Sequence, residues 1–419
     1  MKCGGMMAIG IVLGLQTSMA GGNMGNLHFL DRFDNRLAGW TLNQAGGTVK
    51  IADVSASDKL ELDDRSETKS VSAKTPFAAP SAKYIVEYDM CFAANNAGIF
   101  ELLDASNNPI VNVSGGMKNN TLSFSTDTEP ATTVTWTDAT YNQVTLAIDP
   151  AAKTVRCYWI DKSYSASAYN PKKQVAVKNY SGAAAAQLSF RTDSTKTGKT
   201  YIDEVKVYAP DFAIVGDSAS DGKPRWSNDP STVYRLGAAG KPDQTSPPHY
   251  QLGLLLGKKN WVANLGFGGS QSSEIASLAQ TLLLDQGFRR IWIKIGLNDF
   301  NRGLSAATVE KNIQSAVKTL IAGGITPSNI FLCNCYGASM LTAAKDNERK
   351  AYNTWLAAYC PSVGINLVDN DGTITDYTVS PVKPKPAYDI GDGVHLTKAG
   401  SGQMAQNVYK LLKTARQDK

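Results

Sequence analysis

The chain has 419 residues, a hydrophobic share of 42% and a formal net charge of +5. This length allows about two to three domains, and the apolar share is sufficient for a large core. The 42 basic residues form no dense block, so we expect no nucleic acid partner and regard the small positive excess as a property of the surface.

The first 20 residues have the pattern of a secretory signal peptide. Lys2 supplies the positive charge, Met6 to Leu15 form an apolar run, and Ser18-Met19-Ala20 places small residues before Gly21. A membrane anchor or an unstructured tail is the alternative. The run is too short to span about 30 Å of hydrocarbon, and no other segment is apolar enough. We therefore expect a secreted protein, extracellular or periplasmic, with no membrane span.

Export would permit disulfide bonds. Once Cys3 is removed with the signal, an odd number of cysteines remains, so at least one is unpaired within the chain. Cys91 and Cys157 lie on expected strands and could pair, or could equally be buried free thiols. Cys333 and Cys335 lie on an expected buried strand without further Cys or His at ligand spacing, so we predict no metal site. The fifth cysteine is Cys360.

Residues 27–210 have the two-residue period of β-strands. Tyr84, Val86, Tyr88 and Met90 occupy alternate positions and would share one face of a strand, and the segment 149–153 is a natural turn between two further alternating runs. Polar turns separate the runs and no long helical period appears. We predict an all-β antiparallel sandwich over 27–210.

From Asp211 to the end of the chain, short apolar runs alternate with amphipathic helical patterns. Such alternation predicts a parallel sheet with helices on both faces, and such sheets place their functional sites at the carboxyl ends of their strands. The expected strands are Phe212–Val215, Trp261–Asn264, Ile291–Ile295, Ile330–Cys333 and Ile365–Val368. Apolar residues at helical spacing follow, among them Val309, Ile313, Val317 and Leu320, and Thr397 is a candidate cap of the last helix.

A nucleophile and its base can be selected from very few residues. The chain has three histidines, His28, His249 and His395. Ser218 lies in a Gly-Asp-Ser turn at the end of the first parallel strand, and Asp392 precedes His395 by three residues. A serine hydroxyl needs a neighbouring base, and a carboxylate can hold that base in the required tautomer. Taken alone, each of these short motifs is more often an ordinary turn.

Two further segments carry possible donors to an oxyanion. Gly269 lies in a Gly-rich turn after the second parallel strand, and Asn298 follows the third. Backbone N–H groups and amide side chains can stabilise the negative charge that develops on an ester carbonyl oxygen.

Four segments resemble the sequence blocks of the SGNH (GDSL-like) hydrolase family, in the family's order: Gly216-Asp217-Ser218, Gly269, Gly296-Leu297-Asn298-Asp299 and Asp392-Gly393-Val394-His395. Ala219 departs slightly from the usual leucine of the first block. The resemblance covers the second half of the chain. It implies an α/β three-layer domain over 211–419 with a five-stranded parallel sheet.

The same resemblance implies a role for each site residue. Ser218 would be the nucleophile, with Asp392 and His395 completing the triad. Ser218, Gly269 and Asn298 would form the oxyanion hole, and no cofactor or metal is implied. Because the serine is not in a Gly-x-Ser-x-Gly motif, an α/β-hydrolase lipase is disfavoured.

The first half resembles a laminin-G or concanavalin-like jelly roll, on the segments 29–34 and 201–208 and on Trp40. Domains of that kind often bind carbohydrate. Trp40, Trp136 and Trp159 could stack on sugars, although aromatic residues of half-buried strands usually pack inward. The sequence identifies no substrate-binding residue.

We expect a carbohydrate esterase that removes acetyl or another short acyl group from an acylated polysaccharide or oligosaccharide. The segment from Ser220 to Tyr250 is polar and rich in Gly, Pro and Ser, which suits a hydrated sugar better than an acyl chain. The alternatives are a lipid-directed esterase, such as a lysophospholipase or thioesterase, and a non-catalytic carbohydrate-binding protein.

Overall fold

The computed structural model describes most of the chain after the expected signal peptide. The described residues are 27–31, 33, 37, 39–54, 57–66, 68–93, 97–116, 121–135, 142–161, 173–195, 197–221, 247–257 and 260–417. The expected signal peptide, Trp136 and residues 222–246 lie outside them. Within the described residues, no helix combines the length and the apolar character needed to cross a membrane.

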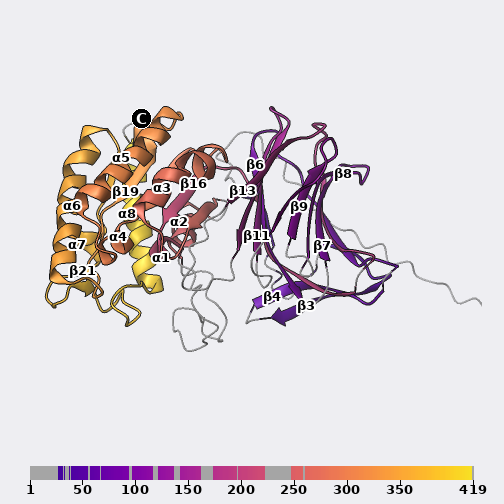
Figure 1. Ribbon diagram of the computed structural model, residues 1–419, viewed down its shortest axis with the longest axis horizontal. Coiled ribbons are helices and arrows are strands. Elements are labelled where there is room, and N and C mark those ends of the chain that lie inside the picture. Colours follow the sequence, from indigo (N-terminus) through magenta and orange to yellow (C-terminus); the bar gives the residue numbers. More distant parts are fainter. Residues whose placement is uncertain are drawn as a thin grey trace, which may run out of the picture.

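Two antiparallel sheets form the first part of the molecule, seen on the right of Figure 1. The strands of the first sheet are β1 (Leu27–Asp31), β3 (Gly47–Val54), β4 (Ser57–Asp64), β6 (Tyr84–Ala93), β11 (Asn142–Asp149), β12 (Thr154–Asp161), β13 (Lys173–Asn179) and β15 (Gly198–Tyr208). Their order is β13-β12-β11-β6-β15-β4-β3, and β1 pairs with β15. The strands of the second sheet are β2 (Thr41–Asn43), β5 (Ser72–Pro76), β7 (Ala97–Leu103), β8 (Pro109–Gly116), β9 (Thr121–Thr126), β10 (Thr132–Thr135) and β14 (Gln187–Thr192). Their order is β10-β9-β8-β7-β14-β5-β2.

The two sheets enclose the apolar residues that the alternating pattern selects. Val86, Tyr88 and Met90 of β6 are buried in one core with residues of the second sheet. Trp40 and Trp159 are 8% and 5% exposed, so they belong to this core and are not sugar-stacking platforms. The all-β sandwich of the prediction is confirmed.

Cys157, one of the two cysteines considered for a disulfide, is a buried free thiol on β12. A Cys91–Cys157 bond is therefore not formed. The side chain of Cys91 lies outside the described residues.

A five-stranded parallel sheet forms the second part, as predicted. Its strands are β16 (Phe212–Gly216), β17 (Val262–Gly266), β18 (Arg290–Lys294), β19 (Ile330–Cys333) and β20 (Asn366–Val368), in the order β17-β16-β18-β19-β20. The helices are α1 (Ser218–Asp221), α2 (Pro248–Leu256), α3 (Ser272–Leu278), α4 (Leu297–Asn301), α5 (Ala306–Ala322), α6 (Ala343–Ser362), α7 (Asp371–Ile374) and α8 (Lys398–Gln417). Shorter elements are the π-helical turn Ala279–Leu284, the 3-10 turn Pro327–Asn329 and the paired strands β21 (Thr375–Asp376) and β22 (Lys383–Pro384).

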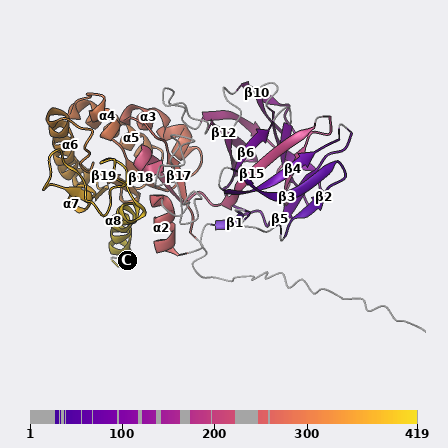
Figure 2. The same cartoon turned by 90° about the horizontal axis from the view of Figure 1, so that it is seen from below.

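The helices cover both faces of the parallel sheet. On one face α2 packs against α8, and on the other α3 and α6 pack against α5 (Figure 2). The sequence determines which face of α5 packs against the core. Its apolar residues recur at helical spacing and are all buried: Val309, Ile313, Val317 and Leu320. Ser305 caps this helix by accepting a hydrogen bond from the backbone N–H of Thr308.

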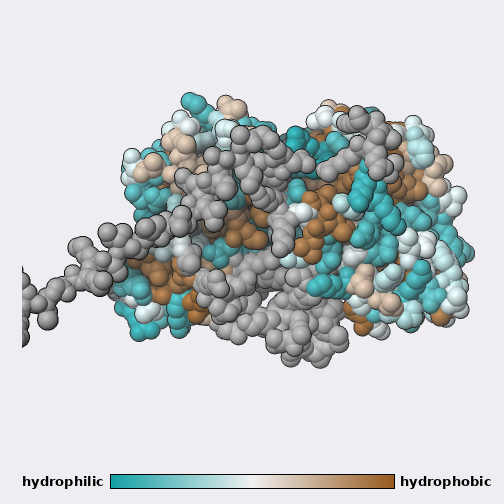
Figure 3. All heavy atoms as spheres, turned by 180° about the vertical axis from the view of Figure 1, so that it is seen from behind, coloured by the Kyte–Doolittle hydropathy of each residue, from teal (hydrophilic) through white to brown (hydrophobic). Residues whose placement is uncertain are grey.

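The sandwich and the α/β part share apolar contacts. Tyr208 is the last residue of β15, and its ring centroid lies 6.1 Å from that of Trp261, next to β17. The Lys206 ammonium lies 4.8 Å from the same indole ring, which leaves Trp261 only 7% exposed. Figure 3 shows hydrophobic surface on the sandwich and on the α/β part, toward the middle of the molecule. A division of the chain at residues 210 and 211 stays a prediction.

Replacement of Tyr208 with alanine tests whether this junction stabilises the protein. Tyr208 is buried among residues of the α/β core. We expect Tyr208→Ala to lower the free energy of unfolding by about 3 to 5 kcal/mol, as for other buried aromatic residues. Urea unfolding of the whole chain measures the loss, and Leu254→Ala, at an exposed position, is the control. A loss no larger than that of the control would show that the contact contributes little.

Candidate active site

Three adjacent strands bring the predicted site segments to one edge of the parallel sheet. Ser218 follows β16, Gly269 follows β17 and Asn298 follows β18. Because β16 lies between β17 and β18 and all three run parallel, their carboxyl ends meet at the same edge. The connection from β16 runs to β17 on one side, and the connection from its other neighbour, β18, runs to β19 in the opposite direction. Parallel sheets open a crevice for ligands at such a point.

Close backbone contacts shape the turn that presents Ser218. Gly216 has a φ of +150°, and a side chain there would collide with the carbonyl oxygen of Lys294 on β18. The Asp217 carboxylate accepts a hydrogen bond from the backbone N–H of Ala219 at 3.0 Å. This bond starts the short helix α1, with Ser218 as its first residue.

The histidine of the last sequence block lies between the serine and the carboxylate. His395 Nε2 is 3.0 Å from Ser218 Oγ, and His395 Nδ1 is 2.6 Å from Asp392 Oδ2. The other carboxylate oxygen of Asp392 accepts the backbone N–H groups of Val394 and His395, at 2.9 and 2.8 Å. The structure thus brings together the three residues that the sequence analysis selected as a triad.

The contacts of Asp392 keep its carboxylate charged. Partial burial alone would raise the pKa of Asp392, but hydrogen bonds from the side chain and backbone of His395, and the charge of the imidazolium, lower the pKa to about 2. Asp392 therefore remains an acceptor for the imidazole N–H throughout the mildly acidic range.

A segment after β19 supports the loop that carries Asp392 and His395. Ser339 donates its backbone N–H to the carbonyl oxygen of Gly393 at 2.9 Å, and the Tyr336 hydroxyl donates to the carbonyl oxygen of Val394 at 3.0 Å. Within the loop, the Asp389 carboxylate accepts the backbone N–H of Gly393 at 2.9 Å. These bonds fix the backbone on both sides of Asp392.

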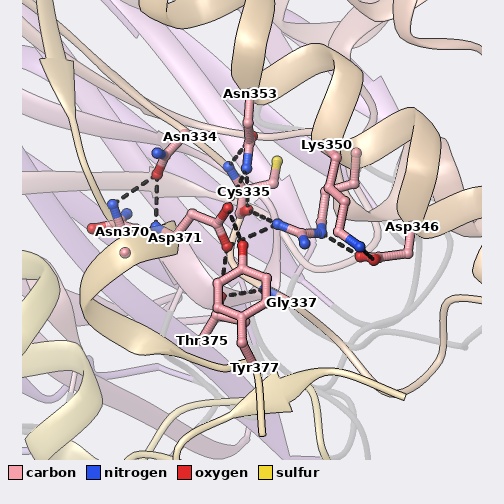
Figure 4. A network of polar contacts seen from close by, with 12 residues as sticks. Asn334, Cys335, Gly337, Asp346, Lys350, Asn353, Asn370, Asp371, Thr375 and Tyr377 are labelled. Atoms are coloured by element: carbon pink, nitrogen blue, oxygen red, sulfur yellow. Dashed lines mark hydrogen bonds and ion pairs between the residues drawn. The ribbon is translucent and has the colours of Figure 1, made fainter. Parts of the chain in front are cut away.

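The supporting segment is itself fastened by a buried polar network, drawn in Figure 4. The guanidinium of Arg349, on α6, is fully buried and donates to Asp346 at 2.6 Å, to the carbonyl oxygen of Cys335 at 2.7 Å and to Asp371 at 2.8 Å. Asn353 binds the backbone of Cys335 and the Asp371 carboxylate. The network joins the loops after β19 and β20 to α6.

A second buried cation pairs with the residue that precedes Ser218. The Lys294 ammonium is 2.8 and 3.0 Å from the two carboxylate oxygens of Asp217, and the Lys294 side chain is 1% exposed. It also lies 4.8 Å from the centre of the Tyr336 ring. Burial alone would lower the pKa of Lys294, but the Asp217 carboxylate raises it above its ordinary value.

The two other expected oxyanion donors lie on connected turns. Gly269 has a φ of +84°, which an L-residue with a side chain rarely adopts. The Asn298 amide donates to the carbonyl oxygen of Ser270 at 3.0 Å, so α4 is attached to the turn that contains Gly269. The same turn is joined to the nucleophile strand by the bond from the Phe267 N–H to the Gly216 carbonyl, at 2.8 Å.

The remaining histidines lie elsewhere. His249 is buried on α2 with its ring 5.9 Å from that of Trp261, and His28 is on β1 of the sandwich. Among the described residues, no three of the types His, Cys, Asp or Glu are grouped so that they could hold a metal ion.

The sequence analysis assigned no role to Lys294, Tyr336 or Arg349. A signal for Lys294 was present, since it is the one charged residue inside the apolar run Ile291–Ile295. Arg349 and Tyr336 act through contacts between distant segments, and no local pattern indicates those contacts.

Breaking the buried ion pair tests its importance. Lys294→Met leaves the Asp217 carboxylate buried without its cation, and we expect the free energy of unfolding to fall by about 3 to 5 kcal/mol. The double variant Asp217→Asn, Lys294→Met carries no unpaired charge and should recover most of this loss. Denaturant unfolding measures both. The control is Lys350→Met, which removes an exposed partner of Asp346. Strictly additive losses in the double variant would contradict the pairing.

Comparison with known proteins identifies a family that this part of the chain matches. Residues 214–402 match the model of the GDSL-like Lipase/Acylhydrolase family, and this range contains all five candidate site residues. No curated protein matches the sequence.

Solved structures similar to this chain cover about half of it. One is a GDSL-like lipase from Bacteroides thetaiotaomicron, with 16% identity and a TM-score of 0.37, covering 50% of this chain and 89% of that one. A second is a member of the lipolytic protein G-D-S-L family from Veillonella parvula, with 16% identity and a TM-score of 0.36, covering 48% and 98%. A third is a variant of an acetyl-xylooligosaccharide esterase from Geobacillus, with 17% identity and a TM-score of 0.38, covering 48% and 94%. With the family match and the parallel sheet, residues 214–402 are identified as a GDSL-like lipase/acylhydrolase domain.

Proposed function

We propose that this protein is a secreted serine esterase that removes acetyl or another short acyl group from a polysaccharide, with Ser218, His395 and Asp392 as its catalytic triad. The observation that carries the proposal is the unbroken chain of contacts from Ser218 Oγ through the imidazole of His395 to the Asp392 carboxylate, at 3.0 and 2.6 Å. These distances are within hydrogen-bond reach for a nucleophile, its base and the group that orients the base.

In the proposed reaction, His395 Nε2 accepts the hydroxyl proton of Ser218 while Oγ attacks the ester carbonyl carbon. Asp392 accepts the Nδ1–H of the imidazole, which keeps Nε2 free to act as the base and stabilises the imidazolium that forms. The imidazolium then gives its proton to the departing sugar hydroxyl. A water molecule, deprotonated by the same imidazole, hydrolyses the acyl-enzyme and releases the carboxylic acid.

The oxyanion of each tetrahedral intermediate would accept hydrogen bonds from the backbone N–H of Ser218, the backbone N–H of Gly269 and the side-chain amide of Asn298. Their places after β16, β17 and β18 support this assignment. Removal of one such donor typically lowers kcat by about 10²- to 10³-fold.

The sugar ester is proposed on the polar composition of the segment that follows the nucleophile. Between Ser220 and Tyr250 charged and small residues predominate, and bulky apolar residues are scattered. A long acyl chain needs an apolar groove, since each methylene contributes about 0.8 kcal/mol only when it is buried. Most of this segment, residues 222–246, lies outside the described residues, so its composition is the support.

Substitution of the triad residues tests the reaction. Ser218→Ala and His395→Ala should each nearly abolish hydrolysis of p-nitrophenyl acetate, and the double variant should be little worse than either, because triad members act as a unit. Asp392→Ala should retain more activity. Near-normal activity of a folded Ser218→Ala protein would exclude Ser218 as the nucleophile.

Acyl-chain length tests the substrate class. For a series of p-nitrophenyl esters from acetyl to decanoyl, we expect kcat/KM to be highest for acetyl and to fall steeply beyond butyryl. Hydrolysis of acetylated xylan, pectin and mannan, followed by acetate release, then identifies the polymer. A maximum at octanoyl or longer chains would replace the carbohydrate esterase with a lipid-directed esterase.

A further inference from the structure

We infer that Asp299 is a positioning residue that fixes the position of the two proposed oxyanion donors, Gly269 and Asn298, relative to each other. The inference rests on the proposed function, because it concerns how the same site stabilises the transition state. Asp299 is fully buried on α4 and directly follows Asn298 in the chain.

The Asp299 carboxylate binds the end of the turn that carries Gly269. It accepts the backbone N–H of Ser272 at 3.0 and 3.1 Å, one distance for each oxygen, and the Ser272 hydroxyl at 2.7 Å. Ser272 is the first residue of α3 and lies three residues after Gly269. The amide of Asn312, on α5, donates to the same hydroxyl at 2.9 Å, so the hydroxyl is held between two helices.

A second hydrogen bond holds the same turn at Ser270, the residue next to Gly269. The side chain of Asn298 donates to the carbonyl oxygen of Ser270 at 3.0 Å. Two consecutive residues of α4 therefore hold the 269–272 turn at two points, at Ser270 through Asn298 and at Ser272 through Asp299. If the hydrogen bonds at Ser272 are lost, the Gly269 N–H and the Asn298 amide are no longer held at a fixed position relative to each other.

The hydrogen bonds between Asp299 and Ser272 depend on the charge of the carboxylate. An ionised Asp299 is an acceptor at both oxygens and can receive the N–H and the hydroxyl of Ser272 together. A protonated Asp299 carries a donor on one oxygen, so it must give up part of this arrangement. Burial raises the pKa of Asp299 to about 6, against the opposing effect of the bonds from Ser272. The ionised form therefore predominates at neutral pH and is lost in mild acid.

The charged and titratable groups around Asp299 come from four neighbouring elements. The Asp217 carboxylate of the nucleophile turn acts in the same direction as burial, and it is itself paired with Lys294. The neighbours from α3, from the loop after β19 and from α6 are Glu274, Cys335 and Tyr352, and burial raises the pKa of each of them.

Protonation of two groups should then determine how steeply activity falls as the pH is lowered. His395 must be unprotonated to act as the base, and Asp299 must be ionised to hold the turn. Asp392 is not a third group, since its pKa is about 2. Protonation of His395 alone gives an acid limb with a slope of about 1 in a plot of log kcat/KM against pH, and protonation of Asp299 adds a further loss of about tenfold, so the limb is steeper than 1 in the range where Asp299 titrates.

The experiment uses the full chain with p-nitrophenyl acetate across the acid and neutral range. The unmodified protein should show the steeper acid limb. Asp299→Asn cannot ionise, so its acid limb should fall to a slope of about 1, and kcat at neutral pH should be about tenfold lower with little change in KM. Asp285→Asn, which removes a carboxylate that precedes β18 and is bonded to Gln280, should keep the steep limb.

Ser272→Ala provides a second variant should Asp299→Asn fail to fold. It removes the hydroxyl donor but keeps the backbone bond and the ionisable carboxylate, so kcat should fall while the steep limb remains. An acid limb with a slope of about 1 in the unmodified protein, or an Asp299→Asn variant with unchanged kcat and pH profile, would overturn the inference. Activity in Ser218→Ala would instead overturn the proposed function, so the two failures are distinguishable.

Discussion

The buried ion pair between Asp217 and Lys294 is the interaction on which the arrangement of the site depends. Two charges in the core lose their hydration, and only close pairing compensates for that loss. Here the pair sits between the strand that ends at the nucleophile and the neighbouring strand β18. The same ammonium faces the ring of Tyr336, whose hydroxyl holds the histidine loop at Val394. One buried cation therefore connects the turn of Ser218 with the loop of His395.

The backbone around this pair leaves little freedom. Gly216 has no side chain to separate β16 from the Lys294 carbonyl, and Gly393 has none to displace Ser339 from the loop of Asp392. On the far side, Arg349 donates to the carbonyl oxygen of Cys335 and to Asp371, which fixes the start of the segment that contains Tyr336 and Ser339. The proposed nucleophile and base thus lie on turns that a buried ion pair and backbone hydrogen bonds hold in place. This favours a site that is formed before substrate binds.

Much of the fold could be predicted from the sequence, because it follows local rules. Period-two alternation defines β6, and helical spacing from Val309 to Leu320 defines α5. Ser218, Asn298 and the Asp392–His395 loop could be selected as candidates because parallel sheets carry their sites at strand ends and because these segments resemble known sequence blocks. The structure places His395 between Ser218 and Asp392. The contacts of Lys294, Arg349 and Asp299 were not found, since they join segments far apart in the chain. Nor did any pattern show that Trp261 would be covered by Tyr208 of the sandwich.

The central claim is that Ser218, activated by His395, forms a covalent bond to the acyl carbon. The most direct test is to treat the full chain with diethyl p-nitrophenyl phosphate, which phosphorylates activated serines, and to map the modified peptide by mass spectrometry. The account predicts one diethylphosphoryl group, on Ser218, formed in step with loss of esterase activity and absent from His395→Ala. Modification of another residue, or complete modification of Ser218 without loss of activity, would contradict it.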